Sequence, residues 1–125
     1  MATSILRDPY PQVREGFPGQ IRKDRHVYAI AFDLDSEALR ANYGDPYNNA
    51  HLEIRKVLQR HGFAWQQGSV YLGSETVTSV TCVLAAMDLA RSLPWFAASV
   101  RDIRMLRIEE LNDLMPAVQQ ATEQG

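Results

Sequence analysis

Two aspartates at the end of a short apolar run have the side chains best suited to chemistry in this chain. The run Tyr28–Leu34 alternates as a strand does, so Asp33 shares one face with two alanines, Ala29 and Ala31. These small residues would let a second copy approach and bring two Asp33 carboxylates together near a two-fold axis. Paired carboxylates share a proton or bind a cation such as Mg²⁺. We therefore predict that Asp33 is catalytic and holds a divalent metal, and that Asp35 caps a helix.

Basic and hydroxyl side chains elsewhere could serve the same reaction. Guanidinium groups suit phosphate, so Arg101 or Arg104 could hold a phosphate and stabilise an anionic transition state. Ser69 and Tyr71, next to a glycine, could donate hydrogen bonds to the same phosphate, although turn and core roles are the favoured alternative. The arginines could equally form ion pairs with the nearby acids Asp102, Glu109 and Glu110.

Other common catalytic patterns are missing from the sequence. The three histidines, His26, His51 and His61, have no metal-ligand spacing with the single cysteine, Cys82. None of them is expected beside Asp33, so a histidine-driven cleavage that uses the ribose 2′-hydroxyl is the second choice of mechanism. Serine- and cysteine-hydrolase patterns, P-loops and dinucleotide fingerprints are absent from the chain.

Length and composition point to one globular domain in a reducing compartment. The chain has 125 residues, a net charge of −2 and one cysteine, so we expect a cytoplasmic protein with no internal disulfide. No apolar run approaches the roughly 20 residues that span a bilayer, and the first 20 residues do not resemble a secretory signal. The charge argues against coating nucleic acid through the net field and still allows a local basic groove.

Several segments must position the candidate residues, beginning with a strand from His26 to Leu34. Residues 47–61 carry apolar side chains at helical spacing, and we expect Asp45 to open this helix and Gly62 to end it. The following stretch favours strands, and Gly68 marks either a tight turn between two short strands or a bulge in one.

The second half predicts a helix, a strand and a terminal helix. The helix spans about residues 76–92, starts at Ser74 or Thr76, stops before Pro94, and turns one apolar stripe to the core: Val80, Val83, Leu84, Met87 and Ala90. Residues 99–109 predict a strand with apolar residues on both faces, which implies either two partly covered faces or a bulge near Met105. Asn112 or Asp113 would cap the last helix.

This order of elements predicts an α+β fold. It is a ferredoxin-like βαββαβ sandwich with a C-terminal helix, in which helices cover one sheet face and the other is available for a homodimer. Residues 1–25, with three prolines and two glycines, predict an irregular N-terminal arm before a domain at residues 26–125.

Motifs between residues 27 and 120 follow the order of a known family. They are Tyr28–Leu34, Gly62-Phe63, Gln67–Tyr71, Trp95, Ser99–Arg104 and Arg107–Glu109. In these motifs the chain resembles the virulence-associated protein D family, which is related to small CRISPR-associated endoribonucleases. The resemblance implies a ferredoxin-like homodimer with endoribonuclease activity that depends on Asp33. It also implies the toxin of a bacterial toxin–antitoxin pair, and it assigns no role to Asp35 or to residues 1–25.

Together these features predict a bacterial enzyme that cleaves RNA. Ser69, Tyr71, Arg101 and Arg104 would contact the RNA, an antitoxin protein would be a further partner, and no membrane is involved. Two other classes stay open. One is a non-catalytic dimer that binds nucleic acid or serves as a scaffold, and the other is a sensor of a small ligand, which that ligand would stabilise against heat.

Overall fold

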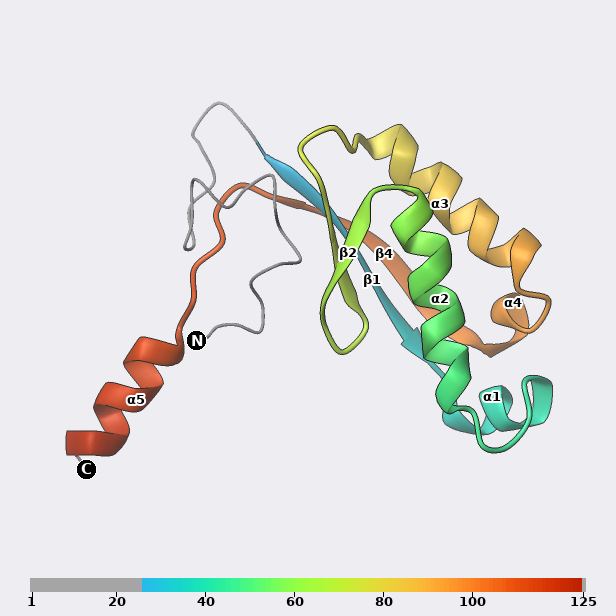
Figure 1. Ribbon diagram of the computed structural model, residues 1–125, viewed down its shortest axis with the longest axis horizontal. Coiled ribbons are helices and arrows are strands. Elements are labelled where there is room, and N and C mark those ends of the chain that lie inside the picture. Colours follow the sequence, from blue (N-terminus) through green and yellow to red (C-terminus); the bar gives the residue numbers. More distant parts are fainter. Residues whose placement is uncertain (1–25, 125) are drawn as a thin grey trace.

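A four-stranded antiparallel sheet with helices on one face forms the body of the protein (Figure 1). The computed structural model describes residues 26–124, so the predicted N-terminal arm lies outside the described residues. The sheet order is β2-β3-β1-β4, as in a ferredoxin-like sandwich, which confirms the predicted fold class. The strands are β1 (Val27–Leu34), β2 (Phe63–Gln67), β3 (Val70–Gly73) and β4 (Val100–Ile108). The helices are α1 (Ser36–Asn42), α2 (Asn48–Arg60), α3 (Ser79–Ser92), α4 (Phe96–Ser99) and α5 (Met115–Gln124).

The two faces of β1 differ as the alternation predicts. Ile30 and Phe32 belong to the main core cluster beneath the helices. Ala29 and Leu72 are buried in a smaller cluster on the opposite face. No residue of a described helix belongs to that second cluster, and we call this side of the sheet the open face.

Strand β4 pairs with β1 in regular register from Val27–Ile108 to Asp33–Asp102. A bulge near Met105 is therefore wrong, and the register shifts instead just beyond Asp33. Along β4, Ile103 packs against the main core and Ile108 against the small cluster. Both faces of this strand are thus partly covered.

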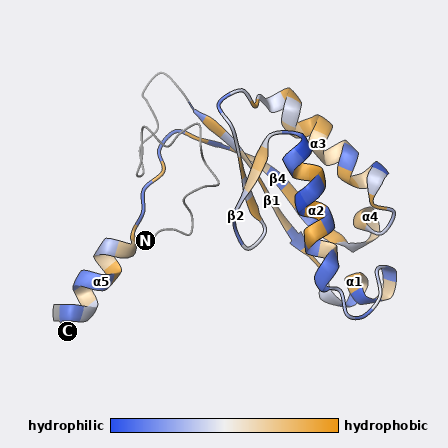
Figure 2. Ribbon diagram, viewed as in Figure 1, coloured by the Kyte–Doolittle hydropathy of each residue, from blue (hydrophilic) through white to orange (hydrophobic). Residues whose placement is uncertain are grey.

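The face of α3 that packs against the core is not the predicted apolar stripe but the opposite face of the helix. Its buried residues are the small Cys82 and Ala85 together with Leu89, whereas Leu84 of the predicted stripe is 52% exposed. Small residues let α3 pack closely against α2 and β1, and the larger apolar side chains remain exposed. Figure 2 shows that α3 is apolar at many positions along its length. The predicted inward stripe is wrong for this reason.

The other helix and strand ends follow some of the predicted signals and not others. Helix α2 begins three residues after Asp45 and has no side-chain cap, so the predicted start is wrong. Gly62 ends α2 with a φ of 91°, as predicted. Gly68, with a φ of 50°, forms the turn between β2 and β3, the first of the two alternatives that the sequence left open. Thr78 caps α3 through a capping box, in place of the residues predicted for that role.

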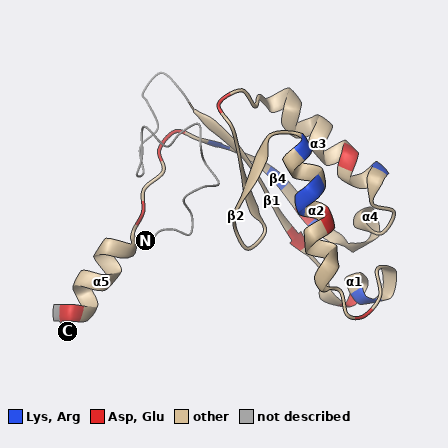
Figure 3. Ribbon diagram, in the orientation of Figure 1, with Lys and Arg blue, Asp and Glu red and all other residues tan. Residues whose placement is uncertain are grey.

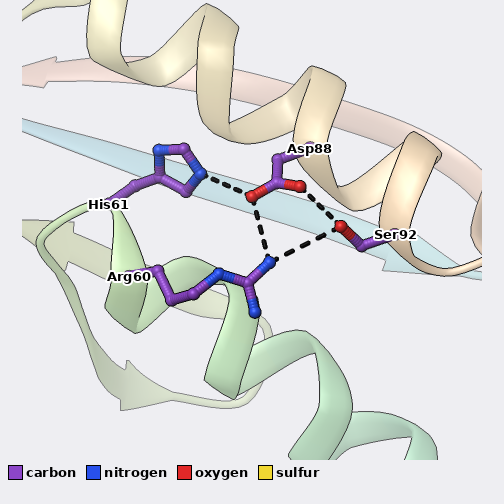
Figure 4. Close-up of polar contacts among 4 residues, drawn as sticks. All are labelled: Arg60, His61, Asp88 and Ser92. Carbon is purple, nitrogen blue, oxygen red and sulfur yellow. Dashed lines mark hydrogen bonds and ion pairs between the residues drawn. The ribbon is translucent and has the colours of Figure 1, made fainter.

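A polar cluster joins the end of α2 to α3 and fixes the rotation of α3 (Figure 4). Arg60 donates to the Asp88 carboxylate at 3.1 Å, and the His61 Nε2 lies 2.7 Å from the same oxygen. Ser92 donates to the other oxygen of Asp88. Hydrogen bonds from Ser92 and His61, and then the Arg60 charge, hold the pKa of Asp88 well below its usual range.

Asp88→Asn should lower the melting temperature at neutral pH, and the melting temperature of this variant should fall less than that of the wild type as the pH is lowered. A carboxyl whose pKa is lowered on folding stabilises the protein above the unfolded value of about 4, and this contribution is lost as the pH falls. The difference in melting temperature between the wild type and Asp88→Asn should therefore be constant above about pH 5 and should narrow as the pH falls below about 4, although part of it should persist at pH 3 because the pKa of Asp88 in the folded protein lies well below that pH. Asp45→Asn, an exposed control, should follow the wild type at every pH. Parallel wild-type and Asp88→Asn curves would contradict the assignment.

Candidate active site on the open sheet face

Asp33 lies at the end of β1 on the open face, and its side chain is 60% exposed. The β1–β4 register places Asp102 directly opposite it, so two carboxylates are neighbours across the strands. Figure 3 shows this acidic end of β1 in red. The sequence identified Asp33 and missed its partnership with Asp102, because nothing local specifies which residues of two distant strands face each other.

Arg101 sits where the register shifts and reaches back toward β1. One of its terminal nitrogens lies 3.8 Å from the Asp33 carboxylate, and the other donates to Asp35 at 3.2 Å. Asp35 is the N-cap of α1 and accepts from the Ala38 amide at 3.0 Å, as predicted. That amide and, more weakly, Arg101 lower the pKa of the Asp35 carboxyl. Asp35 is therefore occupied by capping, while Asp33 projects into solvent.

Arg104 lies on the open face with Asp102 and forms an ion pair with it. Its Nε lies 3.1 and 3.2 Å from the two Asp102 oxygens, and Arg107 likewise pairs with Glu109 at 3.2 Å. The ion pairs considered from the sequence thus form for these two arginines. The ion pair is exposed, so Arg104 could release Asp102 and bind a phosphate in its place. The positive charge of Arg104 would then still face a negative charge.

The two predicted hydroxyl residues of the hairpin are separated by the fold. The Ser69 carbonyl accepts from the Phe32 amide at 3.1 Å, which places Ser69 beside the Asp33 end of β1. Tyr71 pairs with Ile30 and is only 2% exposed in the core beneath the helices. Burial raises the pKa of its phenol. The structure therefore brings Ser69 toward Asp33 and sets Tyr71 apart, and the roles predicted for both remain predictions.

No histidine joins this group. His61 is held by Asp88 on the helix side of the sheet, and His26 contacts Arg107 near the opposite end of β1. His51 is an exposed residue of α2.

The described part of one chain offers few ligands for a metal ion at this site. Among residues 26–124 no group of three or more histidine, cysteine or acidic residues is arranged to hold one. Asp33 offers a carboxylate near Arg101, and Asp102 is bound by Arg104. A second copy that supplied its own Asp33 would double the available carboxylates, which is the arrangement in which these residues fit Mg²⁺.

Comparison with known proteins finds close relatives over most of the chain, although no family model matches it. A Helicobacter pylori protein named Endoribonuclease VapD homolog is 51% identical over 92 residues, which cover 74% of this chain and 96% of the relative. Endoribonuclease VapD 2 of Riemerella anatipestifer is 47% identical over 74% of this chain and 99% of its own length. Endoribonuclease VapD of Dichelobacter nodosus is 44% identical over 76% of this chain and its entire own length.

Proposed function

This chain belongs to the VapD family, and we propose that, like the relatives named as endoribonucleases, it hydrolyses phosphodiester bonds in RNA. The observation that supports this most directly is the exposed Asp33 carboxylate on the open face, beside the guanidinium of Arg101. A carboxylate can accept a proton from water or position a cation, and a guanidinium can neutralise a phosphate.

The proposed active form is a homodimer in which the open faces of two copies meet. Ala31, the alanine nearer to Asp33 on this face, is half-buried, so a second sheet could approach closely there, whereas Ala29 lies in the small cluster against which Leu111 of the same chain packs. Leu106, which pairs with Ala29, is 43% exposed and would be covered by such contact. The two Asp33 side chains would then line one cleft.

In the proposed reaction, Asp33 accepts a proton from the attacking water. The water oxygen forms a bond to phosphorus, and the bond from phosphorus to the ribose 3′-oxygen breaks. The 3′-oxygen leaves with the bonding electron pair and takes a proton from solvent, which gives a 5′-phosphate and a 3′-hydroxyl. Arg101 and Arg104 neutralise the phosphate oxygens as charge develops, and Ser69 donates a hydrogen bond to the backbone. A Mg²⁺ held between two Asp33 carboxylates would supply a more acidic water and a countercharge.

The biological role we propose is that of a toxin in a bacterial toxin–antitoxin pair, acting in the cytoplasm on RNA. The motif resemblance supports this role. None of the helices within residues 26–124 has the length and apolar character needed to cross a membrane.

End-group analysis of cleaved RNA tests this proposal. Wild type and Asp33→Asn are incubated with RNA, with and without a chelator, and the product ends are identified. A 5′-phosphate product that the chelator abolishes supports water activated by Asp33 and a metal. A cyclic phosphate that the chelator does not affect would overturn that mechanism, and RNA binding without cleavage would favour a non-catalytic dimer.

Arg104→Ala should weaken cleavage by about 10-fold or more for every RNA sequence, because a phosphate contact carries no base information. Initial rates on a panel of short RNAs that differ in sequence would measure this. Lys56→Ala, an exposed substitution on α2, is the matched loss of one positive charge and should leave the rates unchanged. A loss confined to a few sequences would mean that Arg104 reads bases.

A further inference from the structure

One of the two tryptophans of this chain is exposed at the edge of the sheet. Trp65 lies in β2, an outer strand, and is 40% exposed, whereas Trp95 is only 8% exposed. Trp65 pairs with Tyr71 of β3, and directly paired residues of antiparallel strands share a face. Because Tyr71 belongs to the core beneath the helices, the indole of Trp65 lies on the helix side of the sheet, beside α2.

Two contacts hold the indole of Trp65 in one orientation. Its Nε1 donates to the Gly68 carbonyl at 2.9 Å, and the guanidinium of Arg55 lies over the ring, 4.4 Å from the ring centre. Nε1 is the only polar atom of the ring and already has a partner, so the ring offers a ligand its flat apolar surface. A fixed aromatic surface of this kind is a platform on which another flat ring can stack.

Arg55 adds a positive charge that no acid within residues 26–124 neutralises. Its Nε is buried and has no hydrogen-bond partner in that part of the chain. Residues 54–74, which include the second half of α2 and the β2–β3 hairpin, contain three arginine or lysine residues and no acidic residue. The Arg55–Trp65 pair therefore combines an aromatic surface with cationic surroundings, which suits an anion that carries a flat ring, as a nucleotide does.

The Arg55–Trp65 pair lies within reach of an RNA strand held at Asp33. Trp65 forms one row with Tyr71 and Ile30 across β2, β3 and β1, and Ile30 precedes Asp33 by three residues. Two strand spacings and three residues separate the Cα atoms of Trp65 and Asp33 by roughly 14 Å. The two side chains lie on opposite faces. A Cβ atom built at Gly68, in the turn between β2 and β3, would meet nothing within 4 Å, so a single strand can pass around this turn.

We propose that a base of single-stranded RNA stacks on the Arg55–Trp65 pair while a phosphodiester a few nucleotides away lies at Asp33. The two residues bind the strand and take no part in bond breaking. Every base has a face that can stack, so the site holds RNA without selecting a sequence. A duplex keeps its bases stacked inside the helix, so the site favours unpaired RNA. The choice of RNA as the ligand rests on the proposed function.

Tryptophan fluorescence during titration with RNA tests the proposal. Asp33→Asn is used so that the RNA stays intact, and the buried Trp95 gives a constant background. We expect single-stranded RNA of any sequence to quench the fluorescence saturably, because a base stacks on Trp65, and a duplex of the same length to leave it unchanged. Equal quenching by the duplex would overturn the proposal. Trp65→Phe should bind RNA without quenching, and quenching that persists in this variant would equally overturn it.

The affinity for labelled RNA measures what the platform contributes. In the Asp33→Asn protein, Trp65→Leu should raise the dissociation constant about tenfold, the scale of one lost base stack, and Trp65→Phe should restore most of the affinity. Arg55→Ala should weaken binding severalfold. Lys56→Ala removes the same charge from the adjacent exposed position of α2 and should change the affinity little. Equal losses from Arg55→Ala and Lys56→Ala would indicate attraction by the overall charge and would overturn the stacking site.

Cleavage assays separate a failure of this site from a failure of the proposed function. In a chain that retains Asp33, Trp65→Leu should raise the KM for RNA about tenfold and leave kcat nearly unchanged, because the lost contact holds the substrate and the transition state equally. An unchanged KM in a folded variant that cleaves RNA would overturn the stacking site alone. Binding of RNA that depends on Trp65, in a wild-type protein that does not cleave it, would overturn the proposed cleavage alone.

Discussion

Asp33→Asn should lower the rate of RNA cleavage by at least about 100-fold, the scale of losing a general base or a metal ligand. Asparagine keeps the size of the side chain and removes its charge and its capacity to accept a proton. The side chain is exposed and forms a long ion pair of 3.8 Å with the Arg101 guanidinium, so the fold should tolerate the change.

The control for this result is Asp45→Asn, the same chemical change at an exposed position outside the candidate site. It should cleave RNA at the wild-type rate, and both variants should melt near the wild-type temperature. Full activity in Asp33→Asn with an intact fold would remove Asp33 from the reaction.

Leu89→Ala should lower the free energy of unfolding by about 2–5 kcal/mol, whereas Leu84→Ala should change it by less than about 1 kcal/mol. Leu89 is 0% exposed and its truncation would leave a cavity between α3 and the sheet, while Leu84 is on the exposed side of the same helix. The substitution and the helix are the same in both variants, so helix propensity cancels in the comparison.

Denaturant unfolding of the two variants at one low protein concentration measures this difference. A low protein concentration keeps association between copies from adding to the measured stability. A larger loss from Leu84→Ala than from Leu89→Ala would mean that α3 turns its large residues inward, as its sequence pattern predicts.

The sequence predicts β1 well because one buried face and one open face impose a strict alternation. Bulky Ile30 and Phe32 go under the helices, and Asp33 falls on the opposite side with the alanines. The capping role of Asp35 follows from its place between a strand and a helix. Each of these features is set by residues that are neighbours in the chain.

Helix α3 was harder to predict because it is apolar on more than one side. Periodicity finds the larger side chains, but close packing against α2 and β1 selects Ala85 and Cys82. The contact of Asp88 with Arg60 then fixes that rotation, and it joins residues that are 28 positions apart.

The composition of the candidate site also depends on long-range pairing. Asp102 faces Asp33 only because β4 takes one particular register beside β1, and Arg101 turns toward Asp33 because the register shifts there. Tyr71 was grouped with Ser69 by closeness in sequence, whereas Ser69 lies in the turn before β3 and Tyr71 lies within the strand, where its side chain is buried beneath the helices. Neither the register nor the site of the shift can be inferred from local sequence.

Mixed dimers of wild type and Asp33→Asn give the most direct test of whether two Asp33 side chains act together. The two forms are co-expressed in equal amounts with different tags, allowed to pair at random, and assayed for RNA cleavage. If both carboxylates are required, the activity should fall to about one quarter of that of an all-wild-type sample, the fraction of dimers with two intact subunits. An activity of about one half would show that each Asp33 works alone and would contradict the shared cleft.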